Sequence, residues 1–191
     1  DLSVQFMLET DGTIYQTMDL KDSAWHATKS NFRSVGIEIA NIGAYPLKDH
    51  TLDQWYRKDA NGQTRIVLPA YLANNSGIRT PNFVAHPARN EAVVGKIQDK
   101  ELRQYDLTPQ QYASLIKLTA TLCTVFPKLN CDAPRDSSGK VIEHQLTPEQ
   151  WENYQGLLGH YHVQLDKTDP GPAFDWEKVV KGARKLMSNK A

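Results

Sequence analysis

Apolar and polar residues alternate at the start of the chain, which is the period of a strand with one buried face. In residues 2–8 the apolar positions are Leu2, Val4, Phe6 and Leu8. Asp11-Gly12 follows as a hairpin turn signal, and residues 13–16 are predicted to form the return strand. The chain is therefore predicted to begin with a β-hairpin.

Another strand is predicted at residues 34–40, where the apolar side chains at positions 35, 37 and 39 point to one face. Glu38 then lies on the opposite face, between Gly36 and Ala40. These small neighbours are expected to leave space above its carboxylate.

Three segments carry the signals of helix starts. Thr108-Pro109-Gln110-Gln111 combines an N-cap, a proline at the first helical position and a capping-box glutamine, and apolar residues follow at helical spacing up to Pro127. The same signals recur at Thr147-Pro148-Glu149-Gln150, before a shorter helix that Gly156 or Gly159 would end. A last helix is predicted from about Asp175. Strands with helices packed over them indicate the α/β class.

Residues 43–105 have only weak periodicity and are rich in Pro, Asn and Gly. One short strand is predicted at residues 65–68, after a turn at Asn61-Gly62. A stretch of this length without a clear pattern is usually functional decoration rather than core. We interpret residues 43–105 as an irregular insertion over one face of a single domain formed by residues 1–191.

Composition and charge narrow the classes of function. A chain of 191 residues suits one globular domain, or a core domain with a sizeable insertion. Its 22 basic and 22 acidic residues cancel without long runs of one sign, so nucleic acid is not an expected partner. No apolar stretch approaches the roughly 20 residues that span a bilayer, and the first residues have a strand pattern rather than that of a signal peptide.

The two cysteines, Cys123 and Cys131, are too few for a disulfide framework and lack the paired spacing of a zinc ribbon. They could form one bridge in an exported protein. A buried helix thiol and a separate loop thiol fit the sequence equally well.

Imidazole, carboxylate and lysine side chains concentrate in residues 159–172, beside a Pro-Gly-Pro run. A rigid loop suits metal ligands, and a histidine and an aspartate could each bind zinc if a third protein ligand and a water completed a tetrahedron. Lys167 could then stabilise the oxyanion of a hydrolysis reaction. A His-x-His pair is also often plain surface or core packing, so the spacing leaves both interpretations open.

Three residues outside this loop are further candidates. Glu38 could be a general base that deprotonates water, or a strand carboxylate that faces solvent, and the residues alone favour the second interpretation. Trp25 and His26 could line a cleft in which the indole stacks on a sugar, or could cap the core.

Four short segments then occur along the chain in a definite order. They are residues 11–16, 24–27 (Ala-Trp-His-Ala), 34–39, and 159–160 with 167–176, of which the last reads Lys-Thr-Asp-Pro-Gly-Pro-Ala-Phe-Asp-Trp. Together they resemble the type 2 N-acetylmuramoyl-L-alanine amidases, which are related to peptidoglycan recognition proteins and to amidase-type phage lysozymes. The resemblance covers about residues 2–42 and 106–180 and leaves 43–105 unexplained. It implies a mixed central β-sheet flanked by helices, with zinc in a cleft along one face.

The resemblance also implies roles for individual residues. His160 and Asp169 match zinc ligands, Glu38 the catalytic acid/base and Lys167 the group that stabilises the transition state. Trp25 and His26 match cleft residues near the substrate.

The family's first zinc ligand is a histidine on a strand that precedes the hairpin, and no residue of this chain aligns with it. The domain is therefore expected to lack its first strand here. The third ligand is expected upstream of Asp1, on an N-terminal piece of the same protein that could be a separate chain; alternatively, the zinc site is incomplete.

The resemblance implies zinc-dependent hydrolysis of the amide bond between N-acetylmuramic acid and L-alanine, in peptidoglycan or muropeptides. An alternative is a non-catalytic module that binds muropeptide, and a third is an assembly component in which residues 43–105 form an interface. Because peptidoglycan lies outside the cytoplasmic membrane, a periplasmic or secreted location is expected, although a cytoplasmic recycling role stays open.

Overall fold

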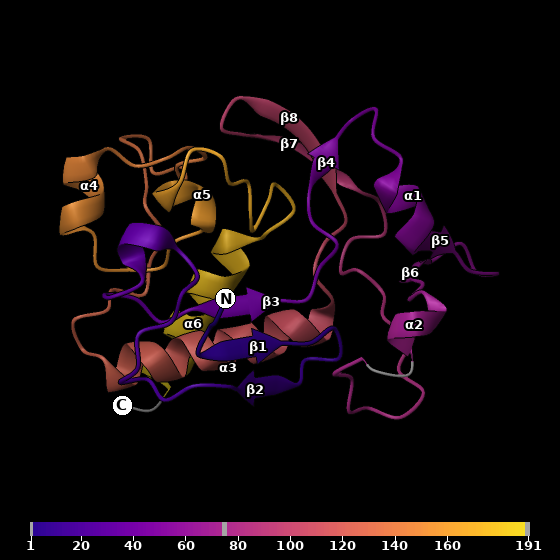
Figure 1. The fold of residues 1–191 in the computed structure, drawn as a ribbon, viewed down its shortest axis with the longest axis horizontal. Coiled ribbons are helices and arrows are strands. Elements are labelled where there is room, and N and C mark those ends of the chain that lie inside the picture. Colours follow the sequence, from indigo (N-terminus) through magenta and orange to yellow (C-terminus); the bar gives the residue numbers. More distant parts are fainter. Residues whose placement is uncertain (1, 74–75, 190–191) are drawn as a thin grey trace.

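The computed structural model describes residues 2–73 and 76–189 and has a mixed α/β fold (Figure 1). Its first sheet contains β1 (Phe6–Leu8), β2 (Ile14–Gln16) and β3 (Ile37–Ile39) in the order β2-β1-β3. Strand β1 is antiparallel to β2 and parallel to β3, so the sheet is mixed, as predicted. The strands are shorter than the predicted ranges 2–8 and 34–40, but they lie within them.

The turn between β1 and β2 depends on Asp11 and Gly12. Oδ1 of Asp11 accepts a hydrogen bond from the Thr13 amide at 2.9 Å, and Gly12 has a φ of +84°. A Cβ at position 12 would also lie 2.7 Å from the carbonyl oxygen of Gln110. Glycine is therefore required here both for its conformation and for its size.

Two helices cover one face of this sheet, α3 (Pro109–Val125) and α6 (Trp176–Ser188), and Figure 1 shows α3 behind β1 with α6 next to α3. The core between the layers includes Leu8, Leu115 and Val179, against which Ile37 and Ile39 pack. The capping box at the start of α3 is present as predicted, with the Gln111 amide donating to Oγ1 of Thr108 at 3.0 Å.

The predicted capping box at Thr147 also forms, and it begins the short helix α4 (Pro148–Asn153). This helix ends at its C-cap Tyr154, before either of the glycines that were expected to stop it. A further single turn, α5 (His160–Val163), follows.

The segment 43–105 is more regular than predicted, because it contains five strands and two short helices where the sequence indicated one strand. They are β4 (Tyr45–Pro46), α1 (Thr51–Trp55), β5 (Tyr56–Lys58), β6 (Thr64–Ile66), α2 (Ala70–Ala73), β7 (Val93–Ile97) and β8 (Lys100–Gln104). The β7–β8 hairpin was missed because its turn, Gln98-Asp99, lacks glycine although both residues have positive φ, +54° and +61°.

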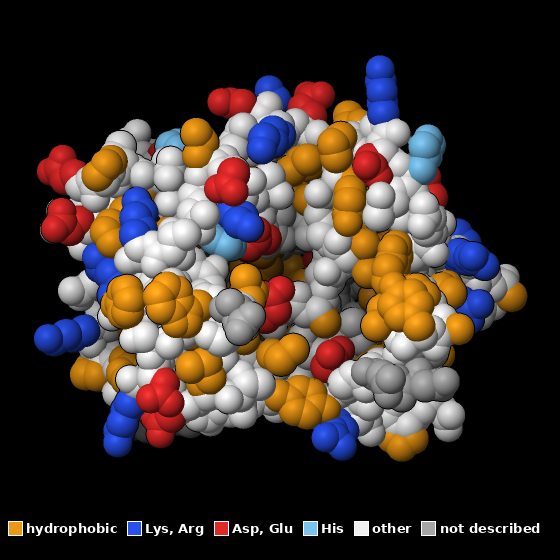
Figure 2. All heavy atoms as spheres, in the orientation of Figure 1, with side chains coloured by type: hydrophobic (Ala, Val, Ile, Leu, Met, Phe, Trp, Pro, Cys, Tyr) orange, Lys and Arg blue, Asp and Glu red, His pale blue; other side chains and the backbone are white. Residues whose placement is uncertain are grey.

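The face of the first sheet opposite α3 and α6 is partly open. Figure 2 shows that the molecular surface on this side is hollowed between the region of β3 and that of the segment 43–105. Polar side chains on this face of β3 therefore have access to solvent.

Both cysteines are buried in one apolar cluster with Ala120 and Ala183, and both thiols are free. None of the helices in residues 2–73 and 76–189 is long and apolar enough to cross a membrane.

Candidate active site

Glu38 lies at the centre of β3, on the face opposite the core, and its side chain is exposed. The alternation of residues predicts this placement, since Ile37 and Ile39 on either side pack into the core. Gly36, on the same face, leaves room for a neighbouring side chain, because a Cβ at position 36 would lie 2.8 Å from Cδ2 of His26. Gly36 thus allows the imidazole of His26 to pack on the strand that carries Glu38.

The loop that carries Trp25 and His26 is held by Asn31. Oδ1 of Asn31 accepts hydrogen bonds from the amides of His26 at 3.0 Å and Ala27 at 2.7 Å. Trp25 does not cap the core, since it is 61% exposed and packs edge-to-face against Phe32 at 6.0 Å between ring centroids. An exposed aromatic pair on a rigid loop can stack on the apolar face of a ligand.

His160 and Asp169 are brought together as the resemblance implied. Nδ1 of His160 lies 3.1 Å from Oδ2 of Asp169, and the Tyr161 amide donates to the Asp169 carbonyl at 3.2 Å. Gly159 allows this approach, because a Cβ at that position would lie 2.6 Å from Cδ of Pro170. The small residue Gly159, just before α5, therefore allows the two candidate ligands to lie side by side.

The pair fits two ligands of one tetrahedral metal ion. Ligand bonds of 2.0–2.1 Å to zinc place neighbouring ligand atoms about 3.3 Å apart in a tetrahedron, close to the distance between His160 and Asp169. Nε2 of His160 donates to Oε1 of Gln164 at 2.6 Å, which leaves Nδ1 as the atom that can bind a metal. Among the described residues, however, no group of three or more His, Cys, Asp or Glu side chains could hold an ion.

The second histidine of the His-x-His pair has a structural role. His162 is fully buried, with Nδ1 accepting from the Gly159 amide at 2.9 Å and Nε2 donating to the Ile142 carbonyl at 2.7 Å. Burial lowers its pKa to about 4, so His162 is neutral at pH 7. Of the two interpretations of this pair, core packing therefore applies to His162.

Electrostatic coupling shows that the candidate residues form one cluster. Partial burial raises the pKa of Glu38, and repulsion from Asp169 raises it further, while His160 and Lys167 oppose the shift. The hydrogen bond to Asp169 raises the pKa of His160 despite partial burial. Burial lowers the pKa of His26, and the nearby charge of His160 adds to this effect. Three distant parts of the sequence thus converge on one site.

Two glutamines that the sequence analysis missed support this cluster. Gln164 lies four residues after His160, a spacing at which side chains meet on a helical turn, so it could have been found. Gln104 donates to the Pro170 carbonyl at 2.9 Å and accepts from the Ala173 amide at 3.0 Å. No local pattern signals Gln104, because its partners lie more than 60 residues away in the sequence.

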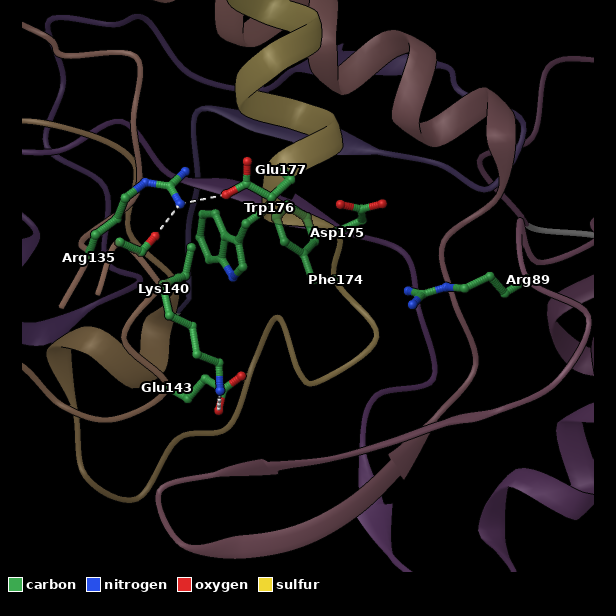
Figure 3. Close-up of a pocket in the computed structure, with 10 residues that line it drawn as sticks. Arg89, Arg135, Lys140, Glu143, Phe174, Asp175, Trp176 and Glu177 are labelled. Carbon is green, nitrogen blue, oxygen red and sulfur yellow. Dashed lines mark hydrogen bonds and ion pairs between the residues drawn. The ribbon is translucent and has the colours of Figure 1, made fainter. Parts of the chain in front are cut away.

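A separate pocket of about 370 Å³ lies beside the start of α6, and it contains none of these cluster residues. Figure 3 shows Arg135 reaching Glu177 across this pocket, at 2.5 Å. Its other basic groups are also paired, Arg89 with Asp106 and Lys140 with Glu143. These ion pairs make it a weak candidate for binding an anion.

Comparison with known protein families gives a match to most of the chain. A family model described as N-acetylmuramoyl-L-alanine amidase matches residues 1–172. This range includes the hairpin, β3, α5 and the loop that carries Lys167 and Asp169. No curated protein and no solved structure matches the chain.

Proposed function

This chain belongs to the N-acetylmuramoyl-L-alanine amidase family, and we propose that it cleaves the bond between N-acetylmuramic acid and L-alanine with zinc as its cofactor. The observation that carries the proposal is the convergence of Glu38, His160, Lys167 and Asp169 on one site. A carboxylate, a lysine and a pair of metal-binding side chains are the groups that hydrolysis of an amide requires.

In this proposal His160 and Asp169 hold the metal together with a third protein ligand. The 3.1 Å distance between Nδ1 of His160 and Oδ2 of Asp169 supports the first part. When bound, zinc would supply a Lewis acid that lowers the pKa of a bound water and polarises the amide carbonyl. Gln164 would fix the orientation of His160 through Nε2.

Glu38 would act as the acid/base. Its carboxylate accepts a proton from the attacking water and then delivers it to the nitrogen of the departing L-alanine. The raised pKa supports this role, because a carboxylic acid with a pKa nearer to neutrality releases and takes up protons more readily at working pH. Lys167 would place its ammonium group near the carbonyl oxygen, where negative charge develops in the transition state.

Trp25 and His26 would line the substrate side of the site. The indole of Trp25 is exposed and oriented by its contact with Phe32, which suits stacking on a pyranose ring. His26 is fixed by Asn31 and packs on Gly36, two residues from Glu38. The substrate would be peptidoglycan or a muropeptide, and we propose a periplasmic or secreted location because intact peptidoglycan lies there.

The direct test incubates the intact, zinc-loaded protein with a muropeptide and measures release of the L-alanine-terminated peptide by mass spectrometry. Release that stops when zinc is removed by a chelator and returns when zinc is added is the expected result. Release that persists unchanged in the metal-free protein would overturn the zinc proposal but not the amidase proposal.

A second candidate function is muropeptide binding without cleavage. It is favoured by the finding that, in the described part of the chain, no group of three or more His, Cys, Asp or Glu side chains could hold a metal, whereas a catalytic zinc takes three protein ligands. Calorimetric titration with the same muropeptide separates the two functions. Binding without any released peptide would decide for the binding module, whereas release would decide for the enzyme.

A further inference from the structure

Gln98 occupies the tip of the β7–β8 hairpin and reaches the loop that carries the candidate catalytic residues. Its Nε2 lies within hydrogen-bond distance of three backbone carbonyls, those of Tyr161 at 3.2 Å, Gln164 at 2.6 Å and Lys167 at 3.2 Å. These partners are 63, 66 and 69 residues away in the sequence. One side-chain amide thus connects the backbone of α5 with the backbone of Gln164 and Lys167.

The rest of Gln98 is also engaged. Its Oε1 accepts from the Gln145 amide at 3.2 Å, and its backbone amide donates to the Glu143 carbonyl at 2.9 Å. The positive φ values of Gln98 and Asp99 form the tight turn at this tip. Both polar atoms of the side chain are therefore used, which leaves little freedom for it to move.

The end of this segment, residues 165–167, has few other constraints. The Lys167 amide donates to the Gln164 carbonyl at a long 3.3 Å, and within the described part of the chain the Lys167 ammonium has no hydrogen bond or ion pair. The position of the Lys167 side chain thus depends on the position of its backbone, which Gln98 holds from the other side.

The same hairpin holds the loop beyond Asp169 as well. Gln104, at the end of β8, donates to the Pro170 carbonyl at 2.9 Å, and Gly95 in β7 allows close contact with Pro172, because a Cβ there would lie 2.8 Å from Cβ of Pro172. Hairpin contacts therefore flank both Lys167 and Asp169.

We propose that Gln98 is a positioning residue, through which the β7–β8 hairpin sets the place of Lys167 and His160 relative to Glu38. This inference rests on the proposed amidase function. It makes the segment 43–105 a working part of the active site rather than a cover over one face. A displacement of about 1 Å at a reacting group can lower a rate about 100-fold, so the loss of this contact has a large expected effect.

The test compares Gln98→Glu with Gln98→Lys in the intact protein. Gln98→Glu keeps the shape and the acceptor for Gln145, but its carboxylate cannot donate and repels the three carbonyls. Gln98→Lys restores donors for these carbonyls. Asp99→Asn is the control, because it alters the charge of the same turn, tolerates positive φ, and replaces a side chain for which the described residues show no hydrogen bond to the loop. Gln98→Asn, which keeps the amide but shortens it, replaces Gln98→Glu if that variant does not fold.

Two readouts separate positioning from general stability. We expect Gln98→Glu to speed hydrogen exchange in residues 164–169 of the metal-free protein, and to lower kcat about 10- to 100-fold with KM changed less than about threefold. Gln98→Lys should recover part of both losses, and Asp99→Asn should match the unmodified chain.

The inference is overturned if exchange and kcat of Gln98→Glu equal those of the unmodified chain. It is also overturned if exchange rises throughout the chain and Gln98→Lys recovers nothing. If the unmodified protein does not hydrolyse muropeptide, the proposed function fails, while the exchange measurement and zinc affinity still decide whether Gln98 orders the loop.

Discussion

Nδ1 of His160 lies 3.1 Å from Oδ2 of Asp169, although the two residues are nine positions apart in the sequence. The intervening chain leaves α5, passes Lys167 and returns, so that the Asp169 carbonyl meets the Tyr161 amide. Two side chains on one closed loop can be held in fixed geometry at low entropic cost, which is the condition that the proposed metal site requires.

The first prediction concerns zinc. Asp169→Ala removes one proposed ligand and should weaken zinc binding by at least about 100-fold, since even supporting residues of metal sites contribute 10- to 100-fold. Competition with a chromogenic chelator measures the affinity. Asp166→Ala, an exposed aspartate of the same loop, is the control and should bind zinc as the unmodified protein does. Equal affinities of the two variants would exclude Asp169 as a ligand.

The second prediction concerns Gly159. Gly159→Ala introduces a Cβ 2.6 Å from Cδ of Pro170, so the loop must shift and separate His160 from Asp169. We expect a loss of about 1–3 kcal/mol in the free energy of unfolding, measured by urea denaturation. Gln155→Ala, at an exposed position nearby, should leave stability unchanged. Unchanged stability of Gly159→Ala would mean that the loop accommodates the methyl group.

The third prediction concerns Glu38. Glu38→Gln preserves shape but cannot transfer a proton, so kcat for muropeptide hydrolysis should fall about 10²- to 10⁴-fold. Because the side chain is exposed and faces away from the core, the melting temperature and the zinc content should stay the same. Glu101→Gln, another exposed strand glutamate, should keep full activity. A Glu38→Gln protein with unchanged turnover would remove Glu38 from the mechanism.

The fourth prediction concerns stability in acid. Burial opposes ionisation of Asp11, but hydrogen bonds from the backbone of Thr13, Thr80 and Arg79 outweigh it and lower its pKa to about 2, against 3.8 for the unperturbed group. Because the folded-state pKa is the lower one, Asp11 stabilises the fold above pH 3.8, and this contribution is lost as the pH falls toward 2.

We expect Asp11→Asn to be about 1–2 kcal/mol less stable than the unmodified chain at pH 6, and the difference to shrink between pH 4 and pH 2. Urea denaturation at a series of pH values measures it. Because both proteins contain all the other carboxylates, the titration of those groups cancels in the difference between the two stabilities. A stability difference that stays constant over this range would show that the charge of Asp11 does not matter.

The fifth prediction concerns the cysteines. Burial, with Cys131 beside it, raises the pKa of the Cys123 thiol to about 12, so this thiol is protonated and unreactive at neutral pH. A thiol reagent should modify neither cysteine in the native protein, since both are buried, and should modify both after unfolding. Unfolded protein without any reactive thiol would instead show that the two cysteines form a disulfide.

Features built from neighbours in the sequence were predictable. The capping boxes at Thr108 and Thr147 and the turn at Asp11 join atoms two or three residues apart, so their residue types alone specify them. The alternation in β3 likewise placed Glu38 opposite the core. The family motifs added the pairing of His160 with Asp169, which spacing alone left open.

The tertiary structure decided the contacts that join distant segments. Gln98 and Gln104 reach the loop around Asp169 from more than 60 residues away, and His26 fills the space over Gly36. Whether a glutamine side-chain amide donates to its own turn or to a remote carbonyl depends on how the hairpin packs against the loop. The local sequence pattern does not predict that packing. The sequence therefore determined which chemical groups are available and on which local elements they lie. Long-range packing determined how these groups are held together, because the hydrogen bonds that hold them form only after the chain has folded.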